Sequence, residues 1–436
     1  MQTCALILVS ISPLLSVAMA QTGGPAVSIL YSFEGIQDGA IPSSPIVALA
    51  NGNLYGTTED GGIRGLGCGE NFRCGTFYQL TPPNSPGGAW TETIEDDFFG
   101  GFGYPFHPYG GLVAGPNGLL YGVAENVGDG IIYSLTPPAP GSGQPWGMRI
   151  VYNFVSRETP VHGIDGLAVG AGGVIYANAG TANNVGAIVQ LQPPATPGGA
   201  WTPSYFQFRD DGSGGKNPTS SIVVSGILYV AMQNGGAFGA GAIVSLEPPA
   251  SPDGAWVETV LYSFTGGADG ANPDGLVNAG NSVLYGVTYS GGLTGCPSTA
   301  TPDCGVIFQL SKVDGLQWNE SVLYAFPPDG SYPDPSLPVI TAGGVLYGTF
   351  NGPERCGYGG SCGSIYQLTP PAAPGDAWTE ATVYTFPGET GGVIPEGPLT
   401  LGPDGFLYGR TLYGGSATCN LPNMITGCGT VFQFVP

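Results

Sequence analysis

The chain has 436 residues, of which 77 are glycine and 41 proline, while 42% are hydrophobic and 11% aromatic. Nine Lys and Arg residues against 31 Asp and Glu give a net charge of −22, which disfavours binding to nucleic-acid phosphates or to anionic membrane surfaces. So many glycines and prolines alongside so many apolar residues exclude a disordered chain. They indicate many short buried strands joined by tight turns.

The first segment, residues 1–20, is typical of a secretory signal peptide. An apolar run covers Ala5–Ala20 and ends in Ala18-Met19-Ala20, a small-residue cleavage site. We therefore expect cleavage near Ala20 and export of a mature domain, residues 21–436, to the periplasm, the cell surface or the medium. No other stretch of the sequence is long and apolar enough to predict a membrane span.

Seven copies of one motif follow along the mature chain. The landmark of the motif is an apolar residue followed by Tyr and usually by Gly. The landmark tyrosines are Tyr55, Tyr121, Tyr176, Tyr229, Tyr285, Tyr347 and Tyr408. Successive tyrosines are 53 to 66 residues apart, a period that indicates repetition of one supersecondary unit.

Each unit contains four apolar runs. A short run such as Gly275–Gly280 precedes the landmark run, and a further run such as Val306–Leu310 follows it. A Pro-rich turn then leads to a run that opens with Trp. All six tryptophans occupy this one position: Trp90, Trp146, Trp201, Trp256, Trp318 and Trp378. β-Branched and aromatic residues dominate the runs and none has a helical period, so we expect four strands per unit and little helix.

The strands are apolar on both faces, so each four-stranded sheet needs a neighbour on either side. The sequence therefore predicts an all-β, seven-bladed β-propeller of four-stranded blades, with an open β-solenoid as the alternative. The seventh unit lacks its Trp-opened strand, whereas Val27–Phe33 matches that strand and places Pro25 at the Trp position. We predict that Val27–Phe33 pairs with Thr430–Phe434 and closes the ring, which removes an exposed edge.

The repeated motif resembles the bacterial GloVer tandem repeat. The resemblance rests on L-Y-G-x-T-x-x-G-G, then G-x-[IV]-F-x-L, then a Pro-rich turn and a W…L-Y-x-F strand, with the best copies at Leu284–Leu310 and Leu346–Leu368. It covers essentially all of the mature chain, and the double glycine after the landmark is also similar to Kelch propellers. The resemblance implies an exported bacterial protein, often held at the surface by a C-terminal anchor that this sequence does not show. It implies no catalytic residues.

The spacing of the cysteines supports export. Besides Cys4, we expect four disulfides between neighbours in the sequence: Cys68–Cys74, Cys296–Cys304, Cys356–Cys362 and Cys419–Cys428. In a propeller these pairs fall on loops between the second and third strands, on the same face as the crossovers between blades. Loops of the opposite face are short, uniform turns. The disulfides either pin long loops or hold the walls of a binding surface.

The crossover at residues 98–109 is rich in aromatic side chains, which can stack on a sugar or an apolar ligand, or else plug the channel. The candidate ligand-binding residues are Phe102, Tyr104, Phe106, His107, Tyr109 and His162, the last being the counterpart of His107 in the next blade. These two histidines with Asp165 offer a metal site as a minor alternative.

Asp-Gly dipeptides recur in the crossovers and fit tight turns, with a Ca²⁺-binding ring of carboxylates as the alternative. They lie at Asp38, Asp211, Asp269 and Asp329. The sequence contains no zinc-binding spacing, nucleophile elbow or phosphate-binding loop, so no catalytic residue and no other cofactor is predicted.

The sequence thus predicts an exported, monomeric, non-catalytic binding or interaction protein that recognises a carbohydrate or a protein through its variable loop face. One alternative is a carbohydrate-active hydrolase or lyase with carboxylates at the channel mouth. Another is a structural protein of the cell envelope.

Overall fold

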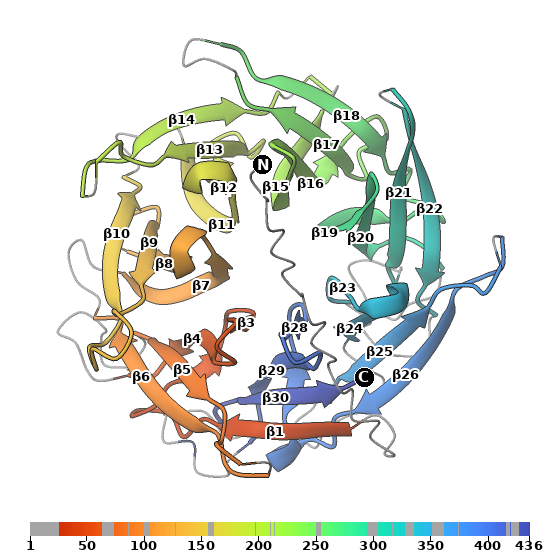
Figure 1. The fold of residues 1–436 in the computed structure, drawn as a ribbon. Helices are drawn as coiled ribbons and strands as arrows, with labels where there is room; N and C mark the ends of the chain where they lie inside the picture. Colours follow the sequence, from red (N-terminus) through yellow and green to blue (C-terminus); the bar gives the residue numbers. More distant parts are fainter. Residues whose placement is uncertain are drawn as a thin grey trace, which may run out of the picture.

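Seven antiparallel sheets surround a central axis in the computed structural model of the protein (Figure 1). The structure describes residues 26–62, 74–85, 87–99, 105–126, 128–155, 161–196, 198–209, 211–212, 214–249, 254–293, 304–315, 317–327, 335–350, 362–373, 375–415, 419 and 427–436. The predicted all-β, seven-bladed propeller is therefore confirmed. The expected signal peptide and Pro25 lie outside the described residues.

Each blade runs from an innermost strand near the axis to an outermost strand at the rim. Blade one contains β2 (Ala40–Pro42), β3 (Val47–Ala48), β4 (Leu54–Asp60), β5 (Thr76–Thr81) and β6 (Thr91–Asp97). Blade two contains β7 (Phe106–Ala114), β8 (Leu120–Glu125), β9 (Ile131–Thr136) and β10 (Gly147–Asn153). Blade three contains β11 (Val161–Val169), β12 (Ile175–Thr181), β13 (Ala187–Gln192) and β14 (Thr202–Gln207).

The remaining blades follow the same order. Blade four contains β15 (Gly215–Val224), β16 (Ile227–Gly235), β17 (Ala242–Glu247) and β18 (Val257–Ser263). Blade five contains β19 (Ala271–Gly280), β20 (Val283–Ser290), β21 (Val306–Asp314) and β22 (Gln317–Ala325). Blade six contains β23 (Val339–Ile340), β24 (Leu346–Phe350), β25 (Ser364–Thr369) and β26 (Thr379–Thr385). Blade seven contains β27 (Val393–Pro395), β28 (Thr400–Leu401), β29 (Leu407–Tyr413), β30 (Thr430–Val435) and β1 (Ala26–Ser32).

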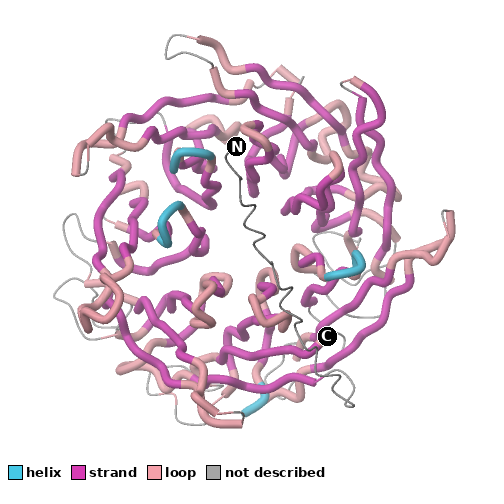
Figure 2. Tube along the Cα trace, viewed as in Figure 1, coloured by secondary structure: helices cyan, strands magenta, loops and turns pink. Residues whose placement is uncertain are grey.

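Among the described residues, helix is limited to single 3₁₀ turns, as expected from the sequence (Figure 2). They are η1 (Pro116–Gly118), η2 (Ala171–Gly173), η3 (Ala342–Gly344) and η4 (Glu389–Gly391). None of the helical segments in the described ranges has the length and apolar character needed to cross a membrane.

The ring closes through strands from both ends of the chain. Strand β1 pairs antiparallel with β30, with Val27 opposite Phe434 and Ser32 opposite Thr430 (Figure 1). The predicted pairing is thus confirmed. Beyond the strand, Phe33 donates its backbone N–H to the carbonyl of Gly429 at 3.0 Å and is fully buried. The N-terminal strand is therefore an integral part of blade seven.

The innermost strands of blades two and five begin earlier than the sequence indicated. The short run expected at Gly275–Gly280 is only the second half of β19, which starts at Ala271. The first half contains Asn272, which has a positive φ of 55°, followed by Pro273. The Asn272-Pro273 pair breaks the alternation of side chains by which a strand is recognised in a sequence. The sequence analysis therefore missed the first half of β19.

Landmark glycines match aromatic residues on the neighbouring strand. Gly122 on β8 lies opposite Tyr133 on β9, and a Cβ atom at Gly122 would collide with the Tyr133 ring. Blade three has Ala177 opposite Val189 instead. The glycine is therefore needed where an aromatic side chain lies across the strand, and it is replaced where the partner is smaller.

The hydrophobic clusters lie between blades, not within them. One cluster unites Tyr121 and Val123 of blade two with Ile175 and Val189 of blade three. Each tryptophan contacts the landmark tyrosine of the preceding blade, as Trp146 does with Tyr55 at a ring-centroid distance of 5.0 Å. The other five pairs are Trp90–Tyr408, Trp201–Tyr121, Trp256–Tyr176, Trp318–Tyr229 and Trp378–Tyr285.

We expect the N-terminal strand to stabilise the whole ring. Deletion of Val27–Phe33 should lower the melting temperature of all seven blades together, because it exposes the edge of β30 and the apolar face of blade one. In the full chain, Phe33→Ala should cost about 3–5 kcal/mol of unfolding free energy, the usual effect of removing a buried ring. Ile29→Ala, at a residue 36% exposed, is the matched control, with an expected cost below about 1 kcal/mol. Chemical denaturation measures both, and a truncated protein that melts like the full one would contradict this prediction.

The pairing of glycine with an aromatic residue can be tested by exchange between blades. Gly122→Ala should destabilise the protein by roughly 1–3 kcal/mol because the new methyl group meets the Tyr133 ring. The double variant Gly122→Ala/Tyr133→Val reproduces the pair found in blade three. It should be more stable than the sum of the single effects predicts, with a coupling of about 0.5–3 kcal/mol. Additive effects in urea denaturation would refute the interpretation.

Candidate functional site

A cavity of about 510 Å³ occupies the central channel, and all seven blades contribute to its lining. One lining residue from each blade, in order, is Pro45, Gly110, Asp165, Thr219, Asp274, Ser336 and Glu396. The volume is within the usual range for small-molecule sites. This axial pocket is the candidate functional site.

The pocket lining comes from one repeated segment of the innermost strands. In five of the blades whose segment lies within the described residues, it begins with a residue of positive φ followed by proline, as in His107-Pro108 and Asn217-Pro218. The N–H of the positive-φ residue donates to a carbonyl of the preceding blade, as Asn217 does to Val185 at 2.8 Å. The residues that follow the proline therefore lie at a fixed place beside the axis, and their side chains vary from blade to blade.

Two buried polar side chains of the pocket lining have no hydrogen-bond partner among the described residues. Asn178 on β12 has 0% relative exposure, and neither atom of its amide is satisfied. Ser221 on β15 is 8% exposed, and its hydroxyl is also unpaired. Both residues line the axial pocket, at the junction of blades three and four. Unpaired buried polar groups are destabilising unless a partner arrives, by about 1–3 kcal/mol each.

Asn178 lies at a position that varies between the blades. The equivalent position, two residues after the landmark tyrosine, is Val123 in blade two and Val287 in blade five. Valine fits this position without loss of a hydrogen bond. The sequence analysis missed Asn178 because it searched for motifs shared by the repeats, and this position varies between blades. It is also polar in blades one, six and seven, as Thr57, Thr349 and Arg410. Thr349 and Arg410 donate side-chain hydrogen bonds to backbone carbonyls, whereas the Asn178 amide has no partner among the described residues.

Three carboxylates from three blades also line the pocket: Asp165, Asp274 and Glu396. Partial desolvation in the channel raises the pKa of Asp165. Glu396 lies 3.4 Å from Nη1 of the buried Arg410. The same guanidinium donates to the carbonyl oxygens of Ser43 and Ser44 at 2.7 and 2.8 Å. Arg410 therefore joins blade seven to blade one and compensates the charge of Glu396.

The predicted aromatic and histidine residues do not line this pocket where they are described. Tyr109 packs into the core between blades two and three, and burial together with the Asp165 carboxylate raises its pKa to about 12. The Phe106 ring contacts the His107 ring at a centroid distance of 5.6 Å. Phe102, Tyr104 and the side chain of His162 lie outside the described residues. Ligand binding by these six residues remains a prediction.

His107 lies between two carboxylates at the junction of blades one and two. Its Nε2 is 3.7 Å from Oδ1 of Asp60, and its Nδ1 is 3.4 Å from Oε2 of Glu125. Across the described ranges, no three His, Cys, Asp or Glu side chains converge in a way that could hold a metal ion.

Two of the described Asp-Gly dipeptides, at Asp38 and Asp269, stabilise turns of the crossovers. The Asp38 carboxylate accepts hydrogen bonds from the Tyr31 hydroxyl and from the backbone N–H groups of Glu34 and Gly35. Asp269 accepts the Tyr262 hydroxyl at 3.0 Å in the same way. The carboxylate oxygens of Asp38 and Asp269 thus have partners in their own loops and on the strands that precede them. Asp329 lies outside the described residues.

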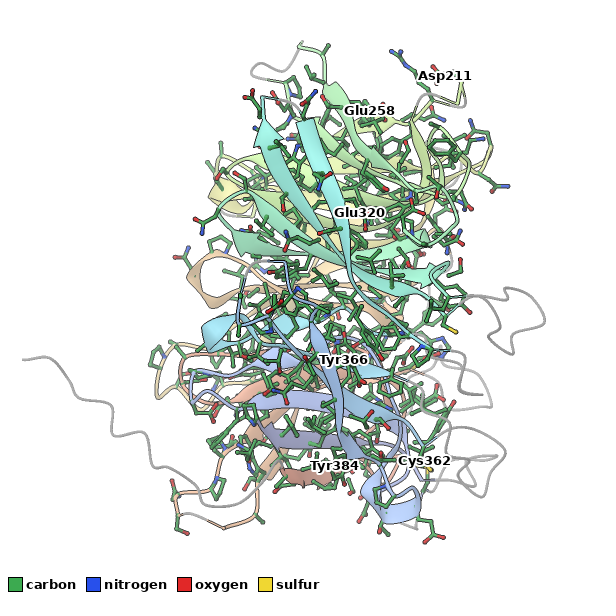
Figure 3. The ribbon with its side chains drawn as sticks, turned by 90° about the vertical axis from the view of Figure 1, so that its right-hand side faces the viewer. Asp211, Glu258, Glu320, Cys362, Tyr366 and Tyr384 are labelled. Carbon is green, nitrogen blue, oxygen red and sulfur yellow. A yellow bond between two sulfur atoms is a disulfide. The ribbon has the colours of Figure 1, made fainter. Side chains whose placement is uncertain are left out.

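A repeated carboxyl group faces these turns from the next blade. Glu92, Glu258 and Glu320 each follow a Trp by two residues on an outermost strand, and their Oε1 atoms are buried without a hydrogen-bond partner. Figure 3 shows Glu258 and Glu320 on adjacent blades. Burial and the neighbouring Asp38 raise the pKa of Glu92 to about 8. Burial and Asp269 raise that of Glu320 to about 7.

One of the four predicted disulfides is fully within the described residues. Cys419 and Cys428 are bonded, with their Cα atoms 5.3 Å apart. Cys74, Cys304 and Cys362 are also disulfide-bonded. Their expected partners lie outside the described residues and are Cys68, Cys296 and Cys356.

A second cavity, of about 830 Å³, lies between the outer strands of blades two and three. It is lined by Trp201, Tyr121 and several prolines of the adjoining turns. The Tyr152 and Tyr205 hydroxyls are hydrogen-bonded at 3.1 Å between these strands. The axial pocket is the better candidate because its buried polar groups lack partners.

The architecture and the axial pocket define the protein as a seven-bladed β-propeller. No family model matches the chain, and no curated protein matches it in sequence. Among solved structures it is similar to the PQQ-bound aldose sugar dehydrogenase of Streptomyces coelicolor, with 12% identity, coverage of 94% of this chain and 98% of that chain, and a TM-score of 0.42. It is also similar to the periplasmic gluconolactonase of Pseudomonas aeruginosa, with 13% identity, coverage of 83% and 95%, and a TM-score of 0.48.

Because its raised pKa keeps Glu92 protonated in the folded protein, we expect the free energy of unfolding to fall as the pH rises. In the unfolded chain Glu92 releases its proton near the ordinary value of 4.5, whereas the folded protein holds it to about pH 8. Between these values the folded state binds more protons than the unfolded state, so the unfolding free energy falls as the pH rises. Glu92→Gln should therefore stabilise the protein by roughly 1–2 kcal/mol near pH 8 and flatten the profile, after allowance for solvent screening. Thermal melts against pH measure this effect, with the exposed Glu247→Gln as control. An unchanged profile in Glu92→Gln would contradict the assignment.

Proposed function

We propose that the protein is an exported binding protein whose axial pocket takes a hydroxyl-rich ligand such as a short oligosaccharide. The observation that carries the proposal is the pair of buried, unpartnered polar side chains in the pocket lining, Asn178 and Ser221. An amide has two donors and an acceptor, and a hydroxyl can donate and accept. A ligand rich in hydroxyl groups satisfies both.

The rest of the pocket supports the same chemistry. Carboxylate oxygens of Asp165 and Asp274 can accept hydrogen bonds from sugar hydroxyls, and Leu167 and Leu337 offer apolar surface to the carbon–hydrogen faces of a sugar ring. The cavity of about 510 Å³ has room for a small molecule without rearrangement of the blades.

The sequence supports an exported location for this binding. The apolar N-terminal segment, the paired cysteines and the resemblance to the GloVer repeat all favour a periplasmic or surface protein. The disulfide between Cys419 and Cys428 is compatible with an oxidising compartment.

Asn178→Val separates a binding role of this residue from a structural one. The change installs the residue that blades two and five carry at the same position, and it removes a buried polar group that has no partner. We expect the melting temperature to hold or rise and the affinity for oligosaccharides to fall by about tenfold or more. Calorimetric titration against a panel of neutral oligosaccharides measures this change.

Val123→Ala is the matched control for this experiment. It alters the equivalent position of blade two, outside the pocket lining, and should cost about 1–3 kcal/mol of stability without changing affinity. Equal affinity of Asn178→Val and the wild type would refute the site. Release of reducing sugars from the panel would show an enzyme and overturn the non-catalytic role.

A further inference from the structure

The cavity of about 830 Å³ between blades two and three is a groove at the rim of the ring, here named the interblade groove. The outermost strands of the two blades, β10 and β14, are neighbours on the rim (Figure 1). The Pro-rich turns of both blades contribute to its lining, and no residue lines both this groove and the axial pocket. The groove has the volume of a small-molecule site and is separate from the site described above.

Blade two departs from the repeat where it lines the groove. Arg149 on β10 lies opposite Ser134 on β9. The other six blades place a small uncharged residue at the position of Arg149: Ser28, Thr93, Ser204, Thr259, Ser321 and Ala381. Five blades place a glutamine at the position of Ser134, and each glutamine amide donates to a hydroxyl of its own sheet: Gln79, Gln190, Gln309, Gln367 and Gln433. Blade two therefore has a shorter side chain on β9 and a cation on β10.

A third departure leaves space beside this cation. Gly147 on β10 lies opposite Thr136 and lines the groove, and a Cβ atom at Gly147 would meet no other atom within 4 Å. Blades one, three and six carry threonine at this position: Thr91, Thr202 and Thr379. Three departures from the repeat thus coincide at one place, and together they form an open groove that contains a guanidinium group.

The charge of the groove is opposite to that of the molecule. The chain has 31 acidic residues against nine Lys and Arg, yet Arg149 is exposed and no carboxylate lines the groove. Within the part of the chain that the structure describes, no ion pair engages Arg149. The planar guanidinium fork matches a carboxylate, which can accept two parallel hydrogen bonds from it. An anionic group on a ligand therefore complements this position.

The surroundings of Arg149 combine apolar and polar groups. Trp201 is half-buried against Tyr121 and lines the groove, as does Ile150, whose side chain is 44% exposed. These side chains offer apolar surface to the carbon–hydrogen face of a sugar ring. The exposed Thr136 hydroxyl and Asn153 amide can form hydrogen bonds with ring hydroxyls.

We propose that the interblade groove is a second binding site, which takes an acidic saccharide. The carboxylate of a uronic acid pairs with the Arg149 guanidinium, and the sugar ring lies against Trp201. The open space at Gly147 admits the ring. This site acts independently of the axial pocket, because the two linings share no residue.

Two disaccharides of equal size test the proposal by calorimetric titration near neutral pH: cellobiouronic acid, which carries one carboxylate, and neutral cellobiose. We expect the acidic disaccharide to bind at least about tenfold more tightly, because only it can pair with the guanidinium. A triglutamate peptide and free acetate are titrated in parallel, and both should bind at least about tenfold more weakly than cellobiouronic acid.

Arg149→Gln and Gly147→Thr locate the site. Arg149→Gln should lower the affinity for cellobiouronic acid about tenfold or more and leave the two disaccharides with equal affinity. Gly147→Thr installs the residue of blades one, three and six, so the melting temperature should hold while the groove is filled and the affinity falls. Lys312→Gln removes the same charge from an exposed position on β21 and should change neither affinity.

The outcomes separate this site from the axial pocket. Wild-type affinity for cellobiouronic acid in both Arg149→Gln and Gly147→Thr refutes the groove, as does the absence of binding to the wild type. Asn178→Val alters only the axial pocket and should leave this affinity unchanged; a loss there, with Arg149→Gln unaffected, moves the sugar to the axial pocket and also refutes the groove. Triglutamate or acetate binding as tightly as cellobiouronic acid overturns the saccharide assignment in favour of an acidic peptide or a simple anion.

Discussion

Contacts that cross from one blade to the next hold this protein together. Single blades are thin sheets with two apolar faces, and each stays folded only because its neighbours cover it. At the rim, tryptophans such as Trp146 pack on the landmark tyrosine of the preceding blade. Deeper in the sheet, Phe98 of blade one meets Tyr133 of blade two at a centroid distance of 5.3 Å. A ring of such contacts has no free end, so the closure by β1 and β30 supports every blade.

The same contacts set the geometry of the axis. A glycine of positive φ precedes the third strand of every blade. In all seven blades the carbonyl of this glycine accepts a hydrogen bond from the N–H of the phenylalanine that follows the fourth strand, as Gly75 does from Phe98. In five of the junctions this glycine also lies against the proline of the next innermost strand, as Gly75 does against Pro108. Since a side chain at the glycine would separate the blades, the position fixes how closely they approach. The pocket lining follows directly from that proline.

The backbone contacts between blades recur around the ring, while the side chains that line the pocket differ from blade to blade. The residues that follow the proline face the pocket, and they include serine, aspartate and glutamate in different blades. Asn178 also lines the pocket, at a position where blades two and five place valine and blades one and six place threonine.

The sequence by itself determined the fold. Seven landmarks, six tryptophans at one position and an orphan strand at Val27–Phe33 specify seven blades and their closure, because repeated local patterns imply repeated local structure. It did not determine the site. Asp165, Asn178 and Ser221 lie at three separate places in the sequence and form no motif, and only the closed ring brings them to one pocket. The upstream halves of the innermost strands were also hidden, since a positive-φ residue before proline interrupts their pattern. Packing between blades, which no local pattern encodes, decided where the polar groups meet.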